Sequence, residues 1–260
     1  MVRYINSADG LNIHYNISGT GQTEIIFVHG ALGSTEWWNH QENYFADKYT
    51  IVLIDLPGHG KSDRTRKNWT AGQYADDIKI VAGQTGSQNK VLVGHSMSGA
   101  YVLEASLSIL QVKAVILADT LKDLDQFISF SQAEQFIFSH YRKDFKDAVE
   151  NMLPQYLFAE TTHRSIQQRL QKEFLKNDPE LAVNVLAPLY KMDIREIAKR
   201  VKVPVRSINS DFTPTNRGNN LKYFKDYDYV NMKGTGHYPM LEKPDEFNMT
   251  LESVLIELSI

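Results

Sequence analysis

Five short runs of apolar and β-branched residues are spaced along the chain, and each of them ends in a turn. They are EIIFVHG (24–30), TIVLIDLPG (50–58), KVLVGHS (90–96), VKAVILADT (112–120) and VPVRSINSD (203–211). Strands that are apolar almost without interruption are buried on both faces, as in a parallel sheet covered by helices. The segment YINSADGLNIHYNIS (4–18) instead alternates apolar and polar residues around an Asp-Gly pair, which predicts a hairpin at the sheet edge.

Helical periodicity separates these predicted strands. In residues 70–82, Thr70 and Gln73 stand at capping-box spacing, and residues 98–110 and the segment that begins at Pro244 also place apolar residues at helical intervals. Residues 121–200 contain only helical patterns, and an insertion of this length is too long for a simple crossover. The pattern therefore predicts an α/β core of residues 1–120 and 201–260 that carries a helical cap, residues 121–200.

Composition excludes several classes of function. The 260 residues have a formal net charge of −3, which does not favour a nucleic-acid partner or an anionic membrane. No cysteine is present, so thiol catalysis and thiolate metal sites are excluded, and no His-Glu-x-x-His or acidic calcium loop indicates another metal site. Without the apolar segment of a signal peptide or a run of about 18 apolar residues, we expect a soluble, cytoplasmic protein with no membrane partner.

The stretch VLVGHSMSGA (91–100) contains the first candidate for chemistry. A strand that turns sharply into a helix presents a serine at its tip, and the residues two before and two after that serine must be small. Ser96 fits, because Gly94 and Ser98 flank it at these distances. Ser98 fits less well, because its hydroxyl would lie in the first helical turn. The alternative for Ser96 is a plain helix N-cap.

A nucleophilic serine needs a base, and His237 in GTGHYPMLEKPDEF is the strongest of eight histidines. It lies between a short strand pattern and the last helix, so it is expected on a loop over the sheet. The turn VHGALGS (28–34) places the backbone N–H of Ala31 near the same edge. With the N–H of Met97, it makes a candidate oxyanion hole; the alternative is a glycine-rich turn that only redirects the chain.

A carboxylate must orient the histidine, and two aspartates follow later strands. Asp211 ends VPVRSINSD and Asp119 ends VKAVILADT; Asp55 also ends a strand but precedes the serine. The residues alone leave the choice between Asp211 and Asp119 open.

The four motifs VHGALGS, DLPGHGKSD, GHSMSG and GTGHYPMLEKPDEF, in this order, resemble the α/β-hydrolase superfamily. The resemblance implies an α/β-hydrolase fold: a mostly parallel eight-stranded sheet flanked by helices, with an inserted helical cap after the sixth strand. It implies that Ser96 is the nucleophile, His237 the base and Asp211 the acid. The family commonly has a Gly-x-x-Asp turn at the acid, whereas this chain has INSDFTPTN, so Asp119 remains the alternative acid.

These residues predict a serine hydrolase that cleaves a small or medium carboxylic ester, thioester or lactone through an acyl-serine, with no cofactor and no metal. The expected partner is therefore a small ester-like molecule; monomer and homodimer are both compatible with the sequence. Expected pocket residues are Trp37, Trp38, His95 and Tyr238, whereas most aromatic residues of the cap are expected to pack in its core.

Two other functions are compatible with the same motifs. One is a carbon–carbon bond hydrolase, for which Arg142, Arg164 and Lys191 are the candidate carboxylate-binding residues in the cap. The other is a ligand receptor that keeps the fold without turnover. An intact serine, histidine and oxyanion loop argue against a pure receptor.

Overall fold

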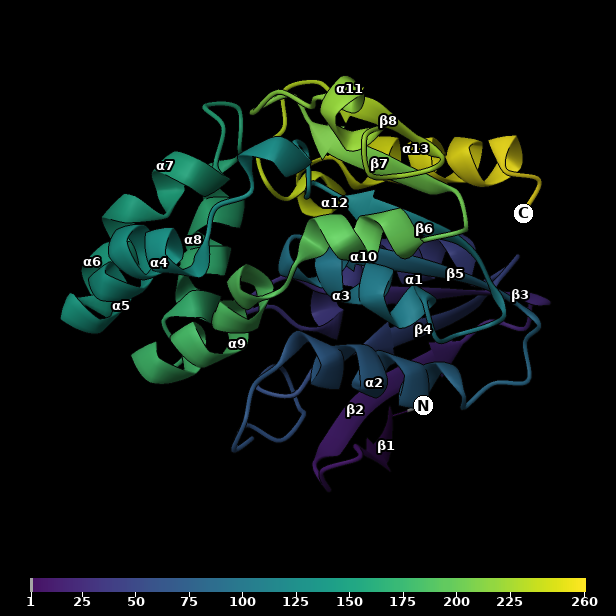
Figure 1. The fold of residues 1–260 in the computed structure, drawn as a ribbon, viewed down its shortest axis with the longest axis horizontal. Helices are drawn as coiled ribbons and strands as arrows, with labels where there is room; N and C mark the ends of the chain where they lie inside the picture. Colours follow the sequence, from purple (N-terminus) through teal and green to yellow (C-terminus); the bar gives the residue numbers. More distant parts are fainter. Residues whose placement is uncertain (1) are drawn as a thin grey trace.

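The computed structural model describes residues 2–260, which form one eight-stranded sheet with helices on both faces (Figure 1). The strands are β1 (Val2–Asn6), β2 (Asn12–Ser18), β3 (Thr23–Val28), β4 (Thr50–Ile54), β5 (Asn89–His95), β6 (Val112–Ala118), β7 (Val205–Ser210) and β8 (Tyr227–Met232). Their order in the sheet is β1-β2-β4-β3-β5-β6-β7-β8. The five buried strands predicted from the sequence are β3 to β7.

The sheet is parallel from β4 to β8 and antiparallel at the edge that holds β1 and β2. The Asp9-Gly10 pair turns the chain between these two strands, and Gly10 has a φ of 86°, which favours glycine. The predicted edge hairpin is therefore present. The mostly parallel eight-stranded sheet confirms the predicted fold class.

Successive residues of a strand point to opposite faces of the sheet. In the central strands both sets of residues are apolar, so helices cover both faces. One face packs against α2 (Ala71–Ala82), α3 (Met97–Ser106) and α10 (Ile194–Arg200). The other face packs against η1 (Thr35–Trp38), α1 (Asn39–Phe45), α12 (Pro239–Glu242) and α13 (Pro244–Glu257). The start of α2 agrees with its predicted cap, since Thr70 Oγ1 accepts a hydrogen bond from the N–H of Gln73.

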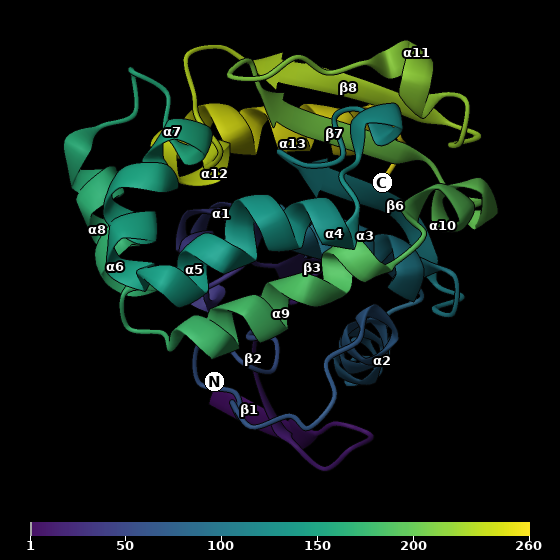
Figure 2. The same ribbon diagram turned by 60° about the vertical axis from the view of Figure 1, so that its left-hand side comes forward.

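Between β6 and β7 the chain forms helices alone. They are η2 (Leu124–Gln126), α4 (Phe130–Ala133), η3 (Glu134–Phe138), α5 (Ser139–Lys143), α6 (Phe145–Asp147), η4 (Ala148–Met152), α7 (Pro154–Leu157), α8 (Arg164–Phe174), α9 (Pro179–Lys191) and α10. Figures 1 and 2 show α4 to α9 gathered at one end of the sheet, whereas α10 lies along it. The short α11 (Arg217–Asn220) follows β7.

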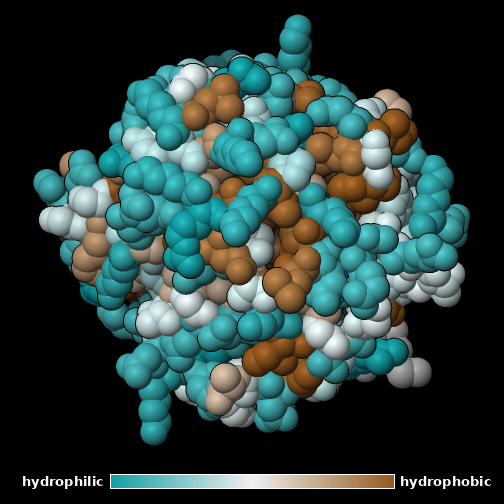
Figure 3. Space-filling model, turned by 45° about the vertical axis from the view of Figure 1, so that its right-hand side comes forward, coloured by the Kyte–Doolittle hydropathy of each residue, from teal (hydrophilic) through white to brown (hydrophobic). Residues whose placement is uncertain are grey.

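The surface mixes polar and apolar side chains. On the face shown in Figure 3, apolar side chains form small groups that are separated by polar residues. Among the helices of residues 2–260, none has the length and hydropathy needed to cross a bilayer.

Candidate active site

Ser96 stands alone between β5, which ends at His95, and α3, which begins at Met97. Its φ of 54° lies in the left-handed region, which is strained for a residue with a side chain. The turn is so tight that a Cβ added to Gly94 would lie 2.5 Å from the backbone oxygen of Ser98. The sharp strand-to-helix turn expected around Ser96 is therefore present.

Ser98 has a different position. Its side chain is fully buried, and its hydroxyl donates a hydrogen bond to the backbone oxygen of His29. This contact joins α3 to the end of β3, so Ser98 helps to hold the turn together and its hydroxyl does not reach solvent.

His237 lies directly against Ser96. Its Nε2 is 2.8 Å from Ser96 Oγ, so the imidazole can accept the proton of the hydroxyl. The backbone of His237 is held from two sides, since its N–H donates to Leu157 O at 2.8 Å and its carbonyl lies 2.7 Å from His95 Nε2. Burial lowers the pKa of His95 to about 3, aided by the nearby His237, so His95 is a neutral donor to that carbonyl.

The carboxylate that lies against His237 is that of Asp119. The sequence analysis expected Asp211 at this place, with Asp119 as the alternative, so the structure corrects that expectation. Asp119 Oδ2 is 2.7 Å from His237 Nδ1, and Asp119 Oδ1 accepts a hydrogen bond from the N–H of Ser210 at 2.7 Å. Burial alone would raise the pKa of Asp119, but the hydrogen bond from His237 and the charges of His237 and Lys122 outweigh it and hold the pKa well below the usual range. Asp119 is therefore an ionised carboxylate.

The position of Asp211 has a simple physical cause. Its N–H donates to the backbone oxygen of Met232 at 3.1 Å, which continues the pairing of β7 with β8 by one residue. The side chain is exposed and accepts a hydrogen bond from the N–H of Gly234 at 2.9 Å. Asp211 therefore supports the turn after β8, away from the imidazole.

The sequence analysis did not single out Glu242, which holds the loop around His237. Its carboxylate accepts hydrogen bonds from the N–H groups of Gly236, at 2.9 and 3.0 Å, and of Tyr238, at 3.1 Å. Thr162, in the segment between α7 and α8, donates to the same carboxylate at 2.7 Å. The sequence contained one signal for this role: Glu242 is an acidic residue that follows the candidate catalytic histidine by only a few positions.

The expected oxyanion donors lie beside the serine. Ala31 lines the cavity that holds Ser96, and Met97 is the first residue of α3. Within residues 2–260, their backbone N–H groups donate to no backbone oxygen, whereas the nearby N–H of Gly33 bonds Gly30 O. Space is tight here, since a Cβ on Gly30 would lie 2.6 Å from His95 Nδ1. The placement is compatible with an oxyanion hole.

Ser96 and His237 open into a cavity of about 530 Å³ between the sheet and the helical insertion. Eighteen residues line it, none of them Asp, Glu, Lys or Arg: Ala31, Leu32, His95, Ser96, Ile128, Phe136, Ile137, Tyr141, Met152, Leu153, Tyr156, Leu157, Phe174, Leu186, Leu189, Tyr190, His237 and Tyr238. The lining is therefore apolar apart from serine, histidine and tyrosine. It includes residues of both π-helices, η3 and η4, a helix type that is frequent at functional sites.

The expected pocket residues divide into two groups. His95 and Tyr238 line the cavity as predicted, but Trp37 and Trp38 do not. Both tryptophans are fully buried: Trp37 packs edge-on against Tyr238 at 5.3 Å between ring centroids, and Trp38 packs against Phe27 at 4.9 Å. Their large apolar rings fill the core under the cavity, which corrects the prediction.

The three basic residues considered for a substrate carboxylate also lie outside this cavity. Arg142 pairs with two surface glutamates, and the ammonium of Lys191 lies 4.6 Å from the ring centre of Phe130. Arg164 begins α8 and does not line the cavity either.

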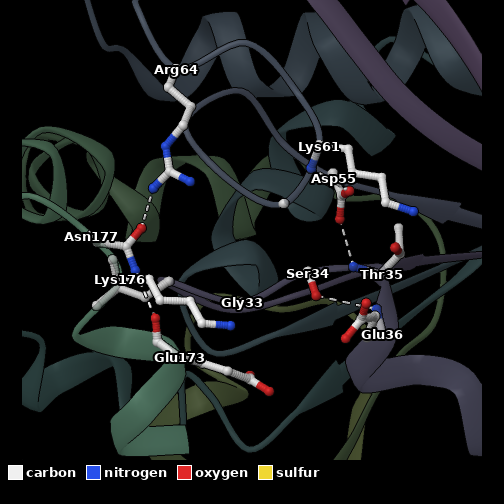
Figure 4. Close-up of a pocket in the computed structure, with 12 residues that line it drawn as sticks. Gly33, Ser34, Thr35, Glu36, Asp55, Lys61, Arg64, Glu173, Lys176 and Asn177 are labelled. Carbon is white, nitrogen blue, oxygen red and sulfur yellow. Dashed lines mark hydrogen bonds between the residues drawn. The ribbon is translucent and has the colours of Figure 1, made fainter.

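A second, smaller cavity of about 230 Å³ lies beside the first and shares Leu32 with it (Figure 4). Its walls carry Lys61, Arg64 and Lys176, but also Asp55, Glu36 and Glu173, so its charges balance. Among residues 2–260, no group of histidine and carboxylate side chains is arranged to hold a metal ion.

Comparisons with known proteins concern the family and the fold. A family model described as "Alpha/beta hydrolase family" matches residues 25–250. The chain is 31% identical over 143 residues, 55% of its length, to the dihydrolipoyllysine-residue acetyltransferase component of the acetoin cleaving system of Cupriavidus necator; the match spans only 38% of that protein. Over 269 residues it is 26% identical to the 2-hydroxy-6-oxononadienedioate/2-hydroxy-6-oxononatrienedioate hydrolase of Paraburkholderia phymatum, covering 96% of this chain and 93% of that protein.

Among solved structures, a thermophilic esterase from Thermogutta terrifontis has a similar fold. The TM-score is 0.84 at 20% sequence identity, with 99% of both chains covered. At this identity the likeness concerns the fold, whereas the family model covers most of the sequence. The chain belongs to the alpha/beta hydrolase family.

Proposed function

We propose that this protein is a serine hydrolase that cleaves neutral carboxylic esters, thioesters or lactones through an acyl-Ser96 intermediate. The chain of contacts from Ser96 to His237 to Asp119 carries the proposal, because it gives a hydroxyl a base and the base an ionised partner. Residues of the helical cap line the cavity into which Ser96 and His237 open.

In the first half of the reaction, His237 Nε2 takes the proton of Ser96 as the hydroxyl attacks the substrate carbonyl. Asp119 holds the tautomer with a proton on Nδ1 and stabilises the imidazolium that forms. The N–H groups of Ala31 and Met97 stabilise the oxyanion, typically by a few kcal/mol. His237 then passes its proton to the leaving alcohol.

In the second half, a water molecule loses a proton to His237 and attacks the acyl carbonyl. The tetrahedral intermediate collapses, the acid product leaves and Ser96 takes back its proton. No step requires a cofactor or a metal.

The cavity favours an apolar acyl group of medium length. About 530 Å³ of largely apolar space suits a molecule of this kind, and its lining contains no Asp, Glu, Lys or Arg. A substrate carboxylate would lie there without a paired charge, which is costly. The hydrolase from Paraburkholderia phymatum is named for a dioate. The apolar lining here favours an ester over such a dianion.

Covalent labelling tests the nucleophile. The purified protein is treated with a fluorophosphonate and the adduct is mapped by mass spectrometry, with an adduct on Ser96 expected and none in Ser96→Ala. Labelling of another residue, or none under conditions where a known serine hydrolase reacts, contradicts the proposal.

A series of nitrophenyl esters from two to twelve acyl carbons tests the reaction. We expect the highest kcat/KM at medium chain length and no turnover by Ser96→Ala. A wild type as inactive as Ser96→Ala on every ester would support a receptor or a carbon–carbon hydrolase instead.

A further inference from the structure

Three tyrosines of the cap line the apolar cavity; Tyr156 is 68% exposed, whereas Tyr141 and Tyr190 are more enclosed. Tyr141 on α5 and Tyr190 on α9 both line it, and Tyr141 is only 4% exposed. Neither hydroxyl makes a hydrogen bond with another group within residues 2–260. Both side chains border the open space of the cavity, so their hydroxyls are free to bond a molecule bound there, which phenylalanine at the same positions could not do.

The packing of the cap holds the two rings in place. Both pack against Phe138, which is fully buried, at ring-centroid distances of 6.4 Å for Tyr141 and 5.9 Å for Tyr190. The two rings meet Phe138 edge-on, at interplanar angles of 65° and 70°. The phenols are therefore positioned rather than mobile.

The two tyrosines and the catalytic groups come from different parts of the fold. Ser96 and His237 lie on loops at the end of the sheet, whereas α5 and α9 belong to the helices gathered over that end (Figure 2). An acyl group attached to Ser96 therefore extends through the cavity toward the cap.

We propose that Tyr141 and Tyr190 form a subsite that hydrogen-bonds a neutral oxygen atom, a hydroxyl or a carbonyl, on the acyl group of the ester substrate. The proposal rests on the proposed esterase function and narrows its substrate class to oxygenated acyl groups. Burial raises the pKa of Tyr190 to about 12 and raises the pKa of Tyr141 as well, so both phenols remain protonated donors.

The absence of charged side chains from the lining limits the oxygen to a neutral group. A carboxylate or phosphate on the acyl tail would have only phenol donors and no cation to pair with. A hydroxyl or a ketone needs one or two hydrogen bonds, which the two phenols supply.

The test measures the preference of the enzyme for an oxygenated acyl group, as the ratio of kcat/KM for an oxygenated ester to kcat/KM for the plain ester. Nitrophenyl octanoate is compared with nitrophenyl esters of hydroxy- and oxo-octanoic acids that carry the oxygen at successive carbons. The wild type is expected to favour the oxygenated ester at one or two of these positions by about tenfold in kcat/KM, since a site with buried donors discriminates against analogues that lack the acceptor.

In Tyr141→Phe and Tyr190→Phe, that preference should fall by about three- to tenfold, the worth of one neutral hydrogen bond. The matched control is Tyr44→Phe, which removes the hydroxyl of a residue on α1 that is 39% exposed, bonded to Glu252 and not part of the cavity lining. Its preference should equal that of the wild type. Fluorophosphonate labelling of Ser96 in every variant checks that the site is folded.

The proposal is overturned if the wild type shows no preference for an oxygenated ester at any position, or if both phenylalanine variants keep the wild-type preference. Cleavage of plain octanoate that depends on Ser96 would still support the esterase function in either case. If no ester is cleaved at all, the esterase function fails and the subsite fails with it.

Discussion

Lys122 Nζ lies 2.7 Å from Asp119 Oδ1, the carboxylate oxygen that does not face His237. The same ammonium donates to Ser210 Oγ at 2.9 Å and to Thr213 Oγ1 at 3.0 Å. The lysine therefore joins the end of β6 to the segment after β7. Both charged side chains are nearly buried, with 12% of Lys122 and 4% of Asp119 exposed, so water screens the pair only weakly.

We predict that Lys122→Met lowers kcat of ester cleavage by about three- to tenfold. The ammonium pairs with Asp119 Oδ1 and donates to Ser210 and Thr213, so it holds in place the carboxylate whose other oxygen faces His237. Methionine has a similar length but no charge and no donor. The rates are measured with a nitrophenyl ester at one fixed pH.

Two control variants separate the charge of Lys122 from a general effect of losing a lysine. Lys122→Arg keeps the charge, and Lys113→Met removes an exposed lysine from β6; both should keep kcat within about threefold of the wild type. A kcat of Lys122→Met equal to that of the wild type would contradict the prediction.

Asp119→Asn should reduce kcat by about a thousandfold or more, because a neutral amide neither fixes the tautomer of His237 nor stabilises its imidazolium. Asp211→Asn is the matched control, since it changes the other candidate carboxylate by the same few atoms. Its effect should stay within about threefold, because Asp211 contacts the N–H of Gly234 and not the imidazole. The opposite ranking of the two variants would reject Asp119 as the acid.

The regular parts of the fold were predictable from sequence because apolar strands and capped helices are local patterns. The choice between Asp119 and Asp211 was not local. It depends on how β6 and β7 end relative to each other: Asp119 N–H donates to Ile208 O, while Asp211 still pairs with β8. A difference of one or two residues in strand length decides which carboxylate meets the histidine, and sequence patterns place strand ends with that much error.

Local sequence patterns also did not determine which side chains line the cavity. Trp37 and Trp38 come soon after the turn VHGALGS (28–34), which led to the prediction that they line the pocket, but their positions on η1 turn both rings into the core. Tyr190 has the same helical spacing as core residues of α9 and yet lines the cavity. Which face of a cap helix meets the cavity depends on how the helices pack on one another, and residue spacing does not determine that.

Gly94→Ala should destabilise the protein by about 1–3 kcal/mol and reduce turnover, because the new Cβ would lie 2.5 Å from the backbone oxygen of Ser98. The turn that presents Ser96 cannot relax without moving α3. The control is Gly86→Ala, where an added Cβ meets nothing within 4 Å. Urea denaturation measures the free energy of unfolding of both variants, and equal stability would show that the turn has more room than the structure indicates.

Thr162→Val should lower kcat by about three- to tenfold with little change in global stability, because it removes one hydrogen bond from a carboxylate that holds the histidine loop. Thr162 Oγ1 donates to Glu242 Oε2, and Glu242 in turn accepts from the N–H groups of Gly236 and Tyr238 on either side of His237. The position of His237 therefore depends on a residue of the segment between α7 and α8.

Thr161→Val provides the comparison, since its side chain is exposed and Thr162 is 4% exposed. Single-turnover kinetics with a nitrophenyl ester separate acylation from deacylation, and both rates should fall in Thr162→Val because the proposed mechanism uses His237 as base in both steps. A change in KM alone would mean that Thr162 affects only how substrate enters the cavity. Equal rates in the two variants would show that Glu242 holds the loop without help from the cap.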